Sequence, residues 1–298
     1  MGSQIDRFVQ YPIYPTLTTL EKFLLKTRVP WPARCPVCGS LTLITGIGRS
    51  LRESCKCVRC KSTNRQRQVA YGICGAVARI TGTRIASLED VARLKDLAVY
   101  NTEAGRQIHD QLSGMPGYVC SEYFGPACRS GDMIGGRMHQ DLMALSFDDK
   151  SLDLVISSDV FEHIPDPYRA HREIHRVLKP GGSHVFTVPF YQTEFEDEDR
   201  TITDIRGNTV LIKDPVYHGD PIRSEGALVH KIFSLEMLVK LRKVGFRTNM
   251  YKIYKPSSGI LGHNALVFEA VAEEQAVLKR EAPSEKEASP EKGVEVAA

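Results

Sequence analysis

The chain has 298 residues, of which 42% are hydrophobic and 25% charged, and its formal net charge is +3. This length predicts one good-sized domain with a small one, or two modest domains, and the composition excludes a chain too polar to build a core. No run approaches the roughly 18 apolar residues of a membrane helix, and the first residues lack the pattern of a secretory signal. We therefore expect a cytoplasmic protein without a membrane span, whose thiols stay reduced.

Residues 1–33 form an N-terminal segment in which 17–26 have the amphipathic pattern of a short helix. Two CxxC pairs follow within residues 34–62, with 18 residues between them: Cys35 and Cys38, then Cys57 and Cys60. This spacing is typical of a zinc ribbon, because two thiolates on one tight turn reach the same tetrahedral ion and a second pair completes the shell. Cys55 competes for one position but lacks the two-residue spacing to Cys60. A filled Cys₄ shell predicts a structural Zn²⁺ ion.

Basic residues outnumber acids around the second cysteine pair. We expect them mainly to form a solvated surface that balances the thiolates, although such a cluster could also contact RNA or an anionic substrate. The basic residues are Arg34, Arg49, Arg52, Lys56, Arg59, Lys61, Arg65 and Arg67, against the single acid Glu53.

The chain from residue 63 onward changes to alternating helices and strands. Residues 63–95 predict a helical connector, with helices over 66–80 and 87–95. Residues 96–273 predict an α/β domain with a parallel sheet. Its expected strands cover 97–101, 118–123, 152–157, 184–188, 248–254 and 265–272, with a further short strand ending at Asp141, and its expected helices cover 106–113, 167–178 and 235–244.

Two segments depart from this alternation. Residues 191–231 form a long charged insert after a strand, and loops of that length in compact domains are commonly lids or binding loops. We therefore predict a substrate lid there. Residues 274–298 are rich in Glu, Lys, Ala, Ser and Pro and contain no aromatic residue, so we predict a disordered tail.

Acidic residues stand at the ends of several predicted strands. Ligands of open α/β sheets bind outside the carboxyl ends of the strands, where Glu103, Glu122 and Asp141 are expected. An acid in the position of Glu122 commonly binds both hydroxyls of a ribose. These positions predict a nucleoside-containing cofactor.

The run from Asp141 to Val188 resembles the type 11 methyltransferase family, through LSFDDKSLDLVISSDVFEHIPD and HREIHRVLKPGGSHVFTVP. The resemblance implies a Rossmann-like, seven-stranded class I methyltransferase fold that binds S-adenosyl-L-methionine. It implies that Glu103 and Gly105 lie near the amino-acid end of this cofactor. It further implies roles at the ribose and adenine for Glu122, Tyr123, Asp141 and Leu142, and near the methionine part for Ser157 and Ser158.

The first loop, TEAGR, departs from the family pattern, which usually has several glycines where this chain has only Gly105. Glycine in this loop lets the backbone approach the ligand closely. The departure keeps open the alternative of a non-catalytic methyltransferase-fold scaffold.

Three histidines are candidate general bases for an acceptor that must lose a proton. His163 follows the fourth strand in FEHIPD, His218 lies in the insert, and His230 precedes the last helix in a segment that resembles the substrate side of related enzymes. The leading hypothesis is transfer of a methyl group to O, N or C of a small-molecule acceptor of secondary-metabolite, sugar or lipid type. The less favoured alternative is an RNA methyltransferase that docks RNA on the ribbon. The sequence leaves the oligomeric state open.

Overall fold

The computed structural model describes residues 26–27, 29–48, 51–204, 208–219, 226–262 and 266–273. The predicted tail and nearly all of the predicted N-terminal amphipathic run lie outside these residues. Within the described part of the chain, none of the helices has the length and apolarity needed to cross a membrane.

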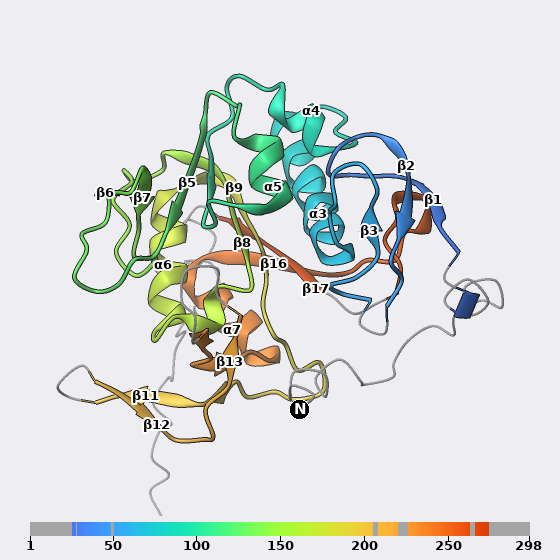
Figure 1. The fold of residues 1–298 in the computed structure, drawn as a ribbon. Helices are drawn as coiled ribbons and strands as arrows, with labels where there is room; N and C mark the ends of the chain where they lie inside the picture. The colour runs from blue at the N-terminus through green and yellow to red at the C-terminus, as the bar shows by residue number, and fades with distance from the viewer. Residues whose placement is uncertain are drawn as a thin grey trace, which may run out of the picture.

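A mixed eight-stranded sheet forms the centre of the protein (Figure 1). Five of its strands are parallel, and β17 runs antiparallel between β16 and β9. The Rossmann-like seven-stranded order is therefore present, with the short β6 added at one edge. From edge to edge the strands are β16 (Phe246–Lys252), β17 (Leu266–Ala272), β9 (Leu178–Thr187), β8 (Leu152–Ser158), β4 (Val99–Asn101), β5 (Tyr118–Glu122), β7 (Arg137–His139) and β6 (Met133–Ile134).

Helices cover both faces of this sheet, because its central strands are apolar on both sides. Along β8, Leu154 and Ile156 join the core beneath α3 (Asn64–Thr81), α4 (Leu88–Ala92) and α5 (Arg106–Leu112). Val155 points the other way, into the core beneath α6 (Pro167–Val177) and α7 (Leu235–Val244). The alternation of side chains along a strand thus builds two cores from one segment.

The cysteine-rich segment forms a three-stranded antiparallel sheet of β1 (Trp31–Arg34), β2 (Leu41–Thr45) and β3 (Lys56–Cys57). This sheet begins three residues before the predicted boundary at 34. Its apolar residues belong to the same core as α3. Arg67 of α3 is fully buried and donates hydrogen bonds to the carbonyls of Cys55, Ser62 and Gly259. The ribbon is therefore fixed to the α/β domain by its own connector helix and by the turn after η2 (Pro256–Ser258).

The insert folds into short antiparallel pairs rather than an irregular loop. β10 (Glu198–Asp199) pairs with β15 (Lys231–Ile232), β11 (Thr201–Thr203) with β12 (Thr209–Leu211), and β13 (Tyr217–His218) with β14 (Ala227–Leu228). Val216, Val229 and Ile232 form a small core of their own. Figure 1 shows the β11–β12 hairpin reaching away from the body of the protein. The β13–β14 pair instead lies at the cavity described next.

Candidate active site

A cavity of about 1300 Å³ lies at the carboxyl ends of the central strands. Its walls come from the loops after β4, β5 and β8, from the insert and from the ribbon. Strand β4 lies between β5 and β8, so the strands that follow it in the chain are added first on one side of it and then on the other. Ligands of doubly wound sheets bind at this kind of switch point.

The predicted cofactor residues meet at this cavity, with one exception. Ser157 does not line it: the side chain is fully buried and its hydroxyl hydrogen-bonds to Nε2 of His184 at 2.8 Å. Ser157 and Ser158 are neighbours on β8 and therefore face opposite sides of the sheet. The residues that do line the cavity are Glu103, Gly105, Glu122, Tyr123, Asp141, Leu142 and Ser158.

The first loop, between β4 and α5, is held against the end of β5. Oε1 of Glu122 accepts a hydrogen bond from the backbone N–H of Ala104 at 3.0 Å. No atom lies within 4 Å of the position that a Cβ would take at Gly105, so the backbone there is open. The Thr102 hydroxyl is buried without a hydrogen-bond partner among the described residues. An open backbone and an unpaired hydroxyl beside a cavity fit a bound polar ligand.

Arg106 ends this loop in a left-handed conformation, with φ of +67°. This conformation costs energy for a residue with a Cβ atom, and a glycine would adopt it more easily. Burial raises the pKa of Glu103 to about 7, although Arg106 and Arg65 oppose the shift. The loop therefore places at the cavity a carboxyl group that ionises near neutral pH.

Asp141 lies beyond β7, where the third parallel strand ends. Its Oδ1 accepts a hydrogen bond from the N–H of Met143 at 2.8 Å, and its own N–H donates to the Ser130 hydroxyl at 2.9 Å. Tyr123 is 40% exposed, and its ring centroid is 5.3 Å from that of His139. These contacts fix a carboxylate and an aromatic ring on one wall of the cavity.

Asp159, which sequence reasoning missed, anchors the ribbon to the wall of the cavity. Its carboxylate lies 2.6 Å from Arg52 and 3.3 Å from Arg65, and it accepts a hydrogen bond from Thr187. The two guanidinium groups overcome the effect of burial and lower the pKa of Asp159. Asp159 adopts φ of +55° directly after β8, which aims it at the ribbon.

This network corrects our expectation of a solvated surface for three of the eight basic residues, whereas Arg34, Lys56, Arg59 and Lys61 are exposed as expected. Arg65 donates to the Ser158 hydroxyl and to Glu53. Arg65 and Arg67 are buried, and Arg52 pairs with Asp159 across more than one hundred residues of sequence. Three of the predicted basic residues therefore bind within the protein. Arg67 lies near the thiols of the ribbon, so part of the predicted charge balance holds there.

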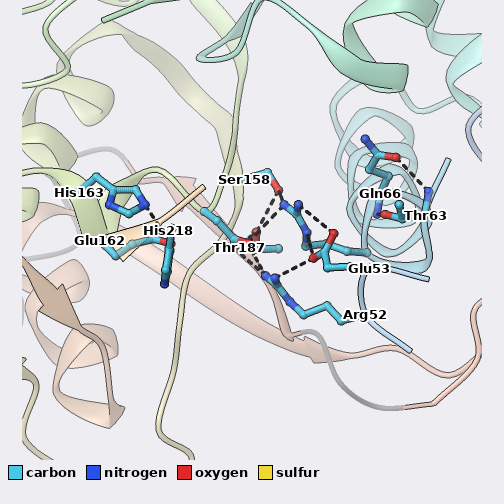
Figure 2. A network of polar contacts seen from close by, with 11 residues as sticks. Arg52, Glu53, Thr63, Gln66, Ser158, Glu162, His163, Thr187 and His218 are labelled. Carbon is cyan, nitrogen blue, oxygen red and sulfur yellow. Dashed lines mark hydrogen bonds and ion pairs between the residues drawn. The ribbon is translucent and has the colours of Figure 1, made fainter. Parts of the chain in front are cut away.

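The three candidate histidines all line the cavity, on the side formed by the insert. Nδ1 of His230 is 2.7 Å from the Thr201 hydroxyl, and burial lowers the pKa of this histidine. Nδ1 of His163 is 2.8 Å from the carbonyl oxygen of Leu228. Glu162, which was not a sequence candidate, lies between His163 and His218 at the end of β8 (Figure 2). Its place next to His163 in FEHIPD was the only available signal.

The four predicted cysteine ligands are close together, with their sulfur atoms within 4.8 Å of one another. Each CxxC pair forms the same turn, in which the N–H of the residue after the second cysteine donates to the carbonyl of the first. Gly39 and Lys61 occupy these equivalent positions, both with positive φ. Cys55 is buried outside the cluster, as the spacing indicated. The donor set fits a tetrahedral, thiolate-binding ion.

Part of the chain is similar in sequence to known methyltransferases. Residues 129–186 match the family model described as a methyltransferase domain. An uncharacterized methyltransferase from Mycobacterium sp. (strain KMS) is 32% identical over 132 residues, 39% of this chain and 52% of the relative. Another, from Mycobacterium ulcerans (strain Agy99), is 26% identical over 205 residues, 62% of this chain and 77% of the relative. The chain spans about half the length of the first of these curated relatives.

Solved structures show more distant likenesses. An S-adenosylmethionine-dependent methyltransferase from Mesorhizobium loti is 18% identical, with a TM-score of 0.37 over 62% of this chain and 98% of that one. A protein described as a SAM-dependent methyltransferase from Methanosarcina mazei is 17% identical, with a TM-score of 0.36 over 62% and 96%. The sequence match makes residues 129–186 similar to a methyltransferase domain, and the strand order of the chain itself defines the α/β fold.

Proposed function

We propose that this protein is an S-adenosylmethionine-dependent methyltransferase that acts on a small-molecule acceptor inside the cavity. The observation that carries the proposal is the cavity itself. It joins the acids at the ends of β4, β5 and β7 to the histidines of the insert. Pockets for one drug-sized ligand measure roughly 300–1000 Å³, so about 1300 Å³ suits a cofactor together with a small acceptor.

Each wall of the cavity has a separate task in this proposal. Glu122 accepts hydrogen bonds from the ribose hydroxyls, Asp141 accepts from the adenine amino group, and Glu103 pairs with the ammonium of the amino-acid end. When bound, the cofactor would supply a sulfonium methyl group, which an acceptor nucleophile attacks while the neutral thioether leaves. The acceptor lies toward the insert, where holding it in line provides much of the rate.

A hydroxyl acceptor loses its proton during this transfer, and an ammonium group must lose a proton before it can act as the acceptor. His230 is the candidate base, because burial lowers its pKa and keeps the ring neutral at neutral pH. Its hydrogen bond with Thr201 fixes the orientation of the ring. The acceptor atom bonds to the methyl carbon, the carbon–sulfur bond breaks, and the proton passes to the imidazole.

A small-molecule acceptor is favoured over RNA because three basic residues in and next to the ribbon are paired within the protein. Arg52 and Arg65 pair with Asp159 and Glu53, and Arg67 binds backbone carbonyls. Cations that are paired within a protein are less available to neutralise phosphates, which supply most non-specific RNA affinity. We further propose that the Cys₄ cluster holds one structural zinc ion, which fixes this part of the wall.

Calorimetric titration with S-adenosylhomocysteine tests the cofactor site. Charge-assisted hydrogen bonds to the Glu122 carboxylate are worth about 1.5–3 kcal/mol. Glu122→Ala should therefore weaken binding roughly 10- to 150-fold, at about 1.4 kcal/mol per decade. Asp141→Ala should cost less, because it removes one bond instead of two. Ser157→Ala is the matched control and should bind as wild type does, since Ser157 faces away from the cavity.

The same titration contains the contrary result. Wild-type protein that binds no S-adenosylhomocysteine at millimolar ligand would favour the scaffold alternative. Equal affinity of wild type and Glu122→Ala would remove Glu122 from the ribose site. Strong, salt-dependent RNA binding by the wild-type protein would instead favour the RNA alternative.

A further inference from the structure

Glu162 is a buried carboxylate whose charge the described residues do not balance by hydrogen bonding. Its side chain is 0% exposed, and neither carboxylate oxygen has a hydrogen-bond partner within the described part of the chain. The imidazole nitrogens of His218 and His163 lie 3.3 and 3.8 Å from Oε1. Buried carboxylates are ordinarily paired or bound to a metal, because losing their hydration is costly. Something positive belongs beside Glu162.

The hydrogen bond of His163 shows which ring nitrogen faces that position. Its Nδ1 lies 2.8 Å from the Leu228 carbonyl, which can only accept, so Nδ1 carries a proton. In the neutral ring, Nε2 then has a lone pair, and this atom faces Oε1 of Glu162. Two lone-pair donors aimed at one another leave a position that a cation would fill. A metal-binding histidine typically donates its other N–H to a carbonyl in this way.

We propose that Glu162, His163 and His218 form a binding site for a divalent transition-metal ion on the wall of the cavity. The three ligand atoms lie within 4.8 Å of one another. Bonds of about 2.0–2.2 Å to one ion separate tetrahedral ligand atoms by roughly 3.4 Å. The distances of 3.3 and 3.8 Å are close to that value, and the third, between the two imidazoles, is at most 4.8 Å.

The ligand chemistry separates this site from the Cys₄ cluster. Two imidazoles and one carboxylate suit zinc, iron, cobalt or manganese, whereas four thiolates select zinc and softer ions and do not suit manganese. Three protein ligands leave coordination positions open, as catalytic metal sites do. His163 and His218 line the cavity, so these positions face it. The role of this ion rests on the proposed function: an oxygen of the acceptor binds the ion and is thereby oriented toward the methyl group.

Direct metal binding tests the proposal with the ribbon's own metal left in place. The full-length protein is treated with a weak chelator, desalted and titrated with Mn²⁺, and free Mn²⁺ is followed by electron paramagnetic resonance. We expect one equivalent of bound Mn²⁺ per chain. Loading with Zn²⁺ should likewise add one equivalent to the zinc of the ribbon. Losing a group that only hydrogen-bonds to a metal ligand costs about 10–100-fold in metal affinity. Glu162 is proposed as a ligand itself, so Glu162→Gln should lower the affinity for Mn²⁺ by at least about 100-fold.

The control and the second variant protect the result against misfolding. His230→Gln changes a histidine of the same cavity outside the cluster and should retain one equivalent of Mn²⁺. Glu162→Gln preserves side-chain volume and should still bind S-adenosylhomocysteine. If it does not fold, His218→Ala replaces it, because His218 lies on the insert with a side chain 19% exposed. Added Mn²⁺ should raise the Tm of wild type and of His230→Gln, but not that of Glu162→Gln or His218→Ala.

Two results would overturn the metal site. The first is wild-type protein that binds neither Mn²⁺ at millimolar concentration nor a second zinc, in which case a proton shared with His218 balances Glu162. The second is equal Mn²⁺ affinity in wild type and Glu162→Gln. A wild-type protein that binds S-adenosylhomocysteine but fails to bind Mn²⁺ would refute the metal site alone. A wild-type protein that binds Mn²⁺ but fails to bind S-adenosylhomocysteine would refute the cofactor site alone.

Discussion

The Cys₄ cluster and the cluster of Glu162, His163 and His218 are built in opposite ways. The cysteines stand in two pairs with fixed spacing, and each pair closes its own turn. His218 instead comes from an insert more than fifty residues after His163, and the β13–β14 pair brings it to the cavity. Four cysteines can fill a tetrahedral shell, whereas two histidines and one carboxylate can supply only three of its four ligands.

The difference teaches that local spacing suits a structural site and tertiary contact suits a reactive one. A closed turn holds its ligands wherever the turn is placed. A site assembled from η1 (Phe161–His163) and the insert forms only when the insert lies against the sheet. The Asp159 network joins the two regions, because it ties the ribbon to the residue two positions before η1.

The largest expected effect comes from breaking the closed cluster. Cys57→Ser should reduce the zinc of the freshly purified protein from about one ion per chain to nearly none. Structural zinc binding is coupled to folding with an apparent free energy of about 10–16 kcal/mol in small zinc modules. The ribbon should therefore unfold, and proteolysis should cut it first. Zinc analysis and limited proteolysis measure both effects, and unchanged zinc content would remove Cys57 from the ligand set.

Breaking the bridge between the regions should have the next largest effect. Asp159→Ala removes the buried carboxylate that pairs with Arg52 and Arg65, and leaves Arg65 only the exposed carboxylate of Glu53. Breaking a buried ion pair in this way costs about 3–5 kcal/mol of unfolding free energy. Glu53→Ala is the matched control, because Glu53 contacts the same arginines but its side chain is 47% exposed. Exposed pairs contribute about 0–1 kcal/mol. Urea unfolding compares the two variants, and equal losses would show that burial does not matter here.

Asp159 also predicts a pH dependence. The folded state lowers the pKa of this carboxyl below its unfolded value of about 3.9. Its contribution to stability is therefore present above about pH 4 and is lost as the pH falls through the folded-state pKa. Wild type should lose more stability than Asp159→Asn on acidification below that value. Parallel acid-unfolding curves for the two proteins would contradict the predicted shift.

A smaller effect should appear in cofactor affinity near neutral pH. Burial raises the pKa of Glu103 to about 7, and only the ionised form attracts the cofactor's ammonium group. Affinity for S-adenosylhomocysteine should therefore fall as the pH decreases from about 8 to about 6, by at most about tenfold per unit. Glu103→Gln should bind more weakly and show a flatter profile. Calorimetry at several pH values measures this, and identical profiles would exclude Glu103 as the titrating group.

The smallest effect sharpens the comparison from the other side. Cys55 is buried within the ribbon but lies outside the Cys₄ cluster. Cys55→Ser should leave zinc content unchanged, with a modest stability cost from a hydroxyl in a buried position. Loss of zinc in this variant, with retention in Cys57→Ser, would exchange the two ligands.

Elements with strong local signals could be predicted from the sequence. α7 has its predicted bounds, because Ser234 precedes the helix and Gly245 ends it in a left-handed conformation. The cysteine turns likewise depend on neighbours in the chain, as do the acids Glu122 and Asp141 at the ends of their strands. Periodicity and spacing carry such information because the interactions span only a few residues.

Only the tertiary structure decided which side chains meet across long separations. The sequence pattern of basic residues was the same whether Arg52 and Arg65 faced solvent or Asp159. Ser157 and Ser158 were equivalent as neighbours until the pleat of β8 turned one toward His184 and the other toward the cavity. Glu162 gained its significance from His218, because a buried charge is defined by what surrounds it in space, and that depends on the packing of the insert against the sheet.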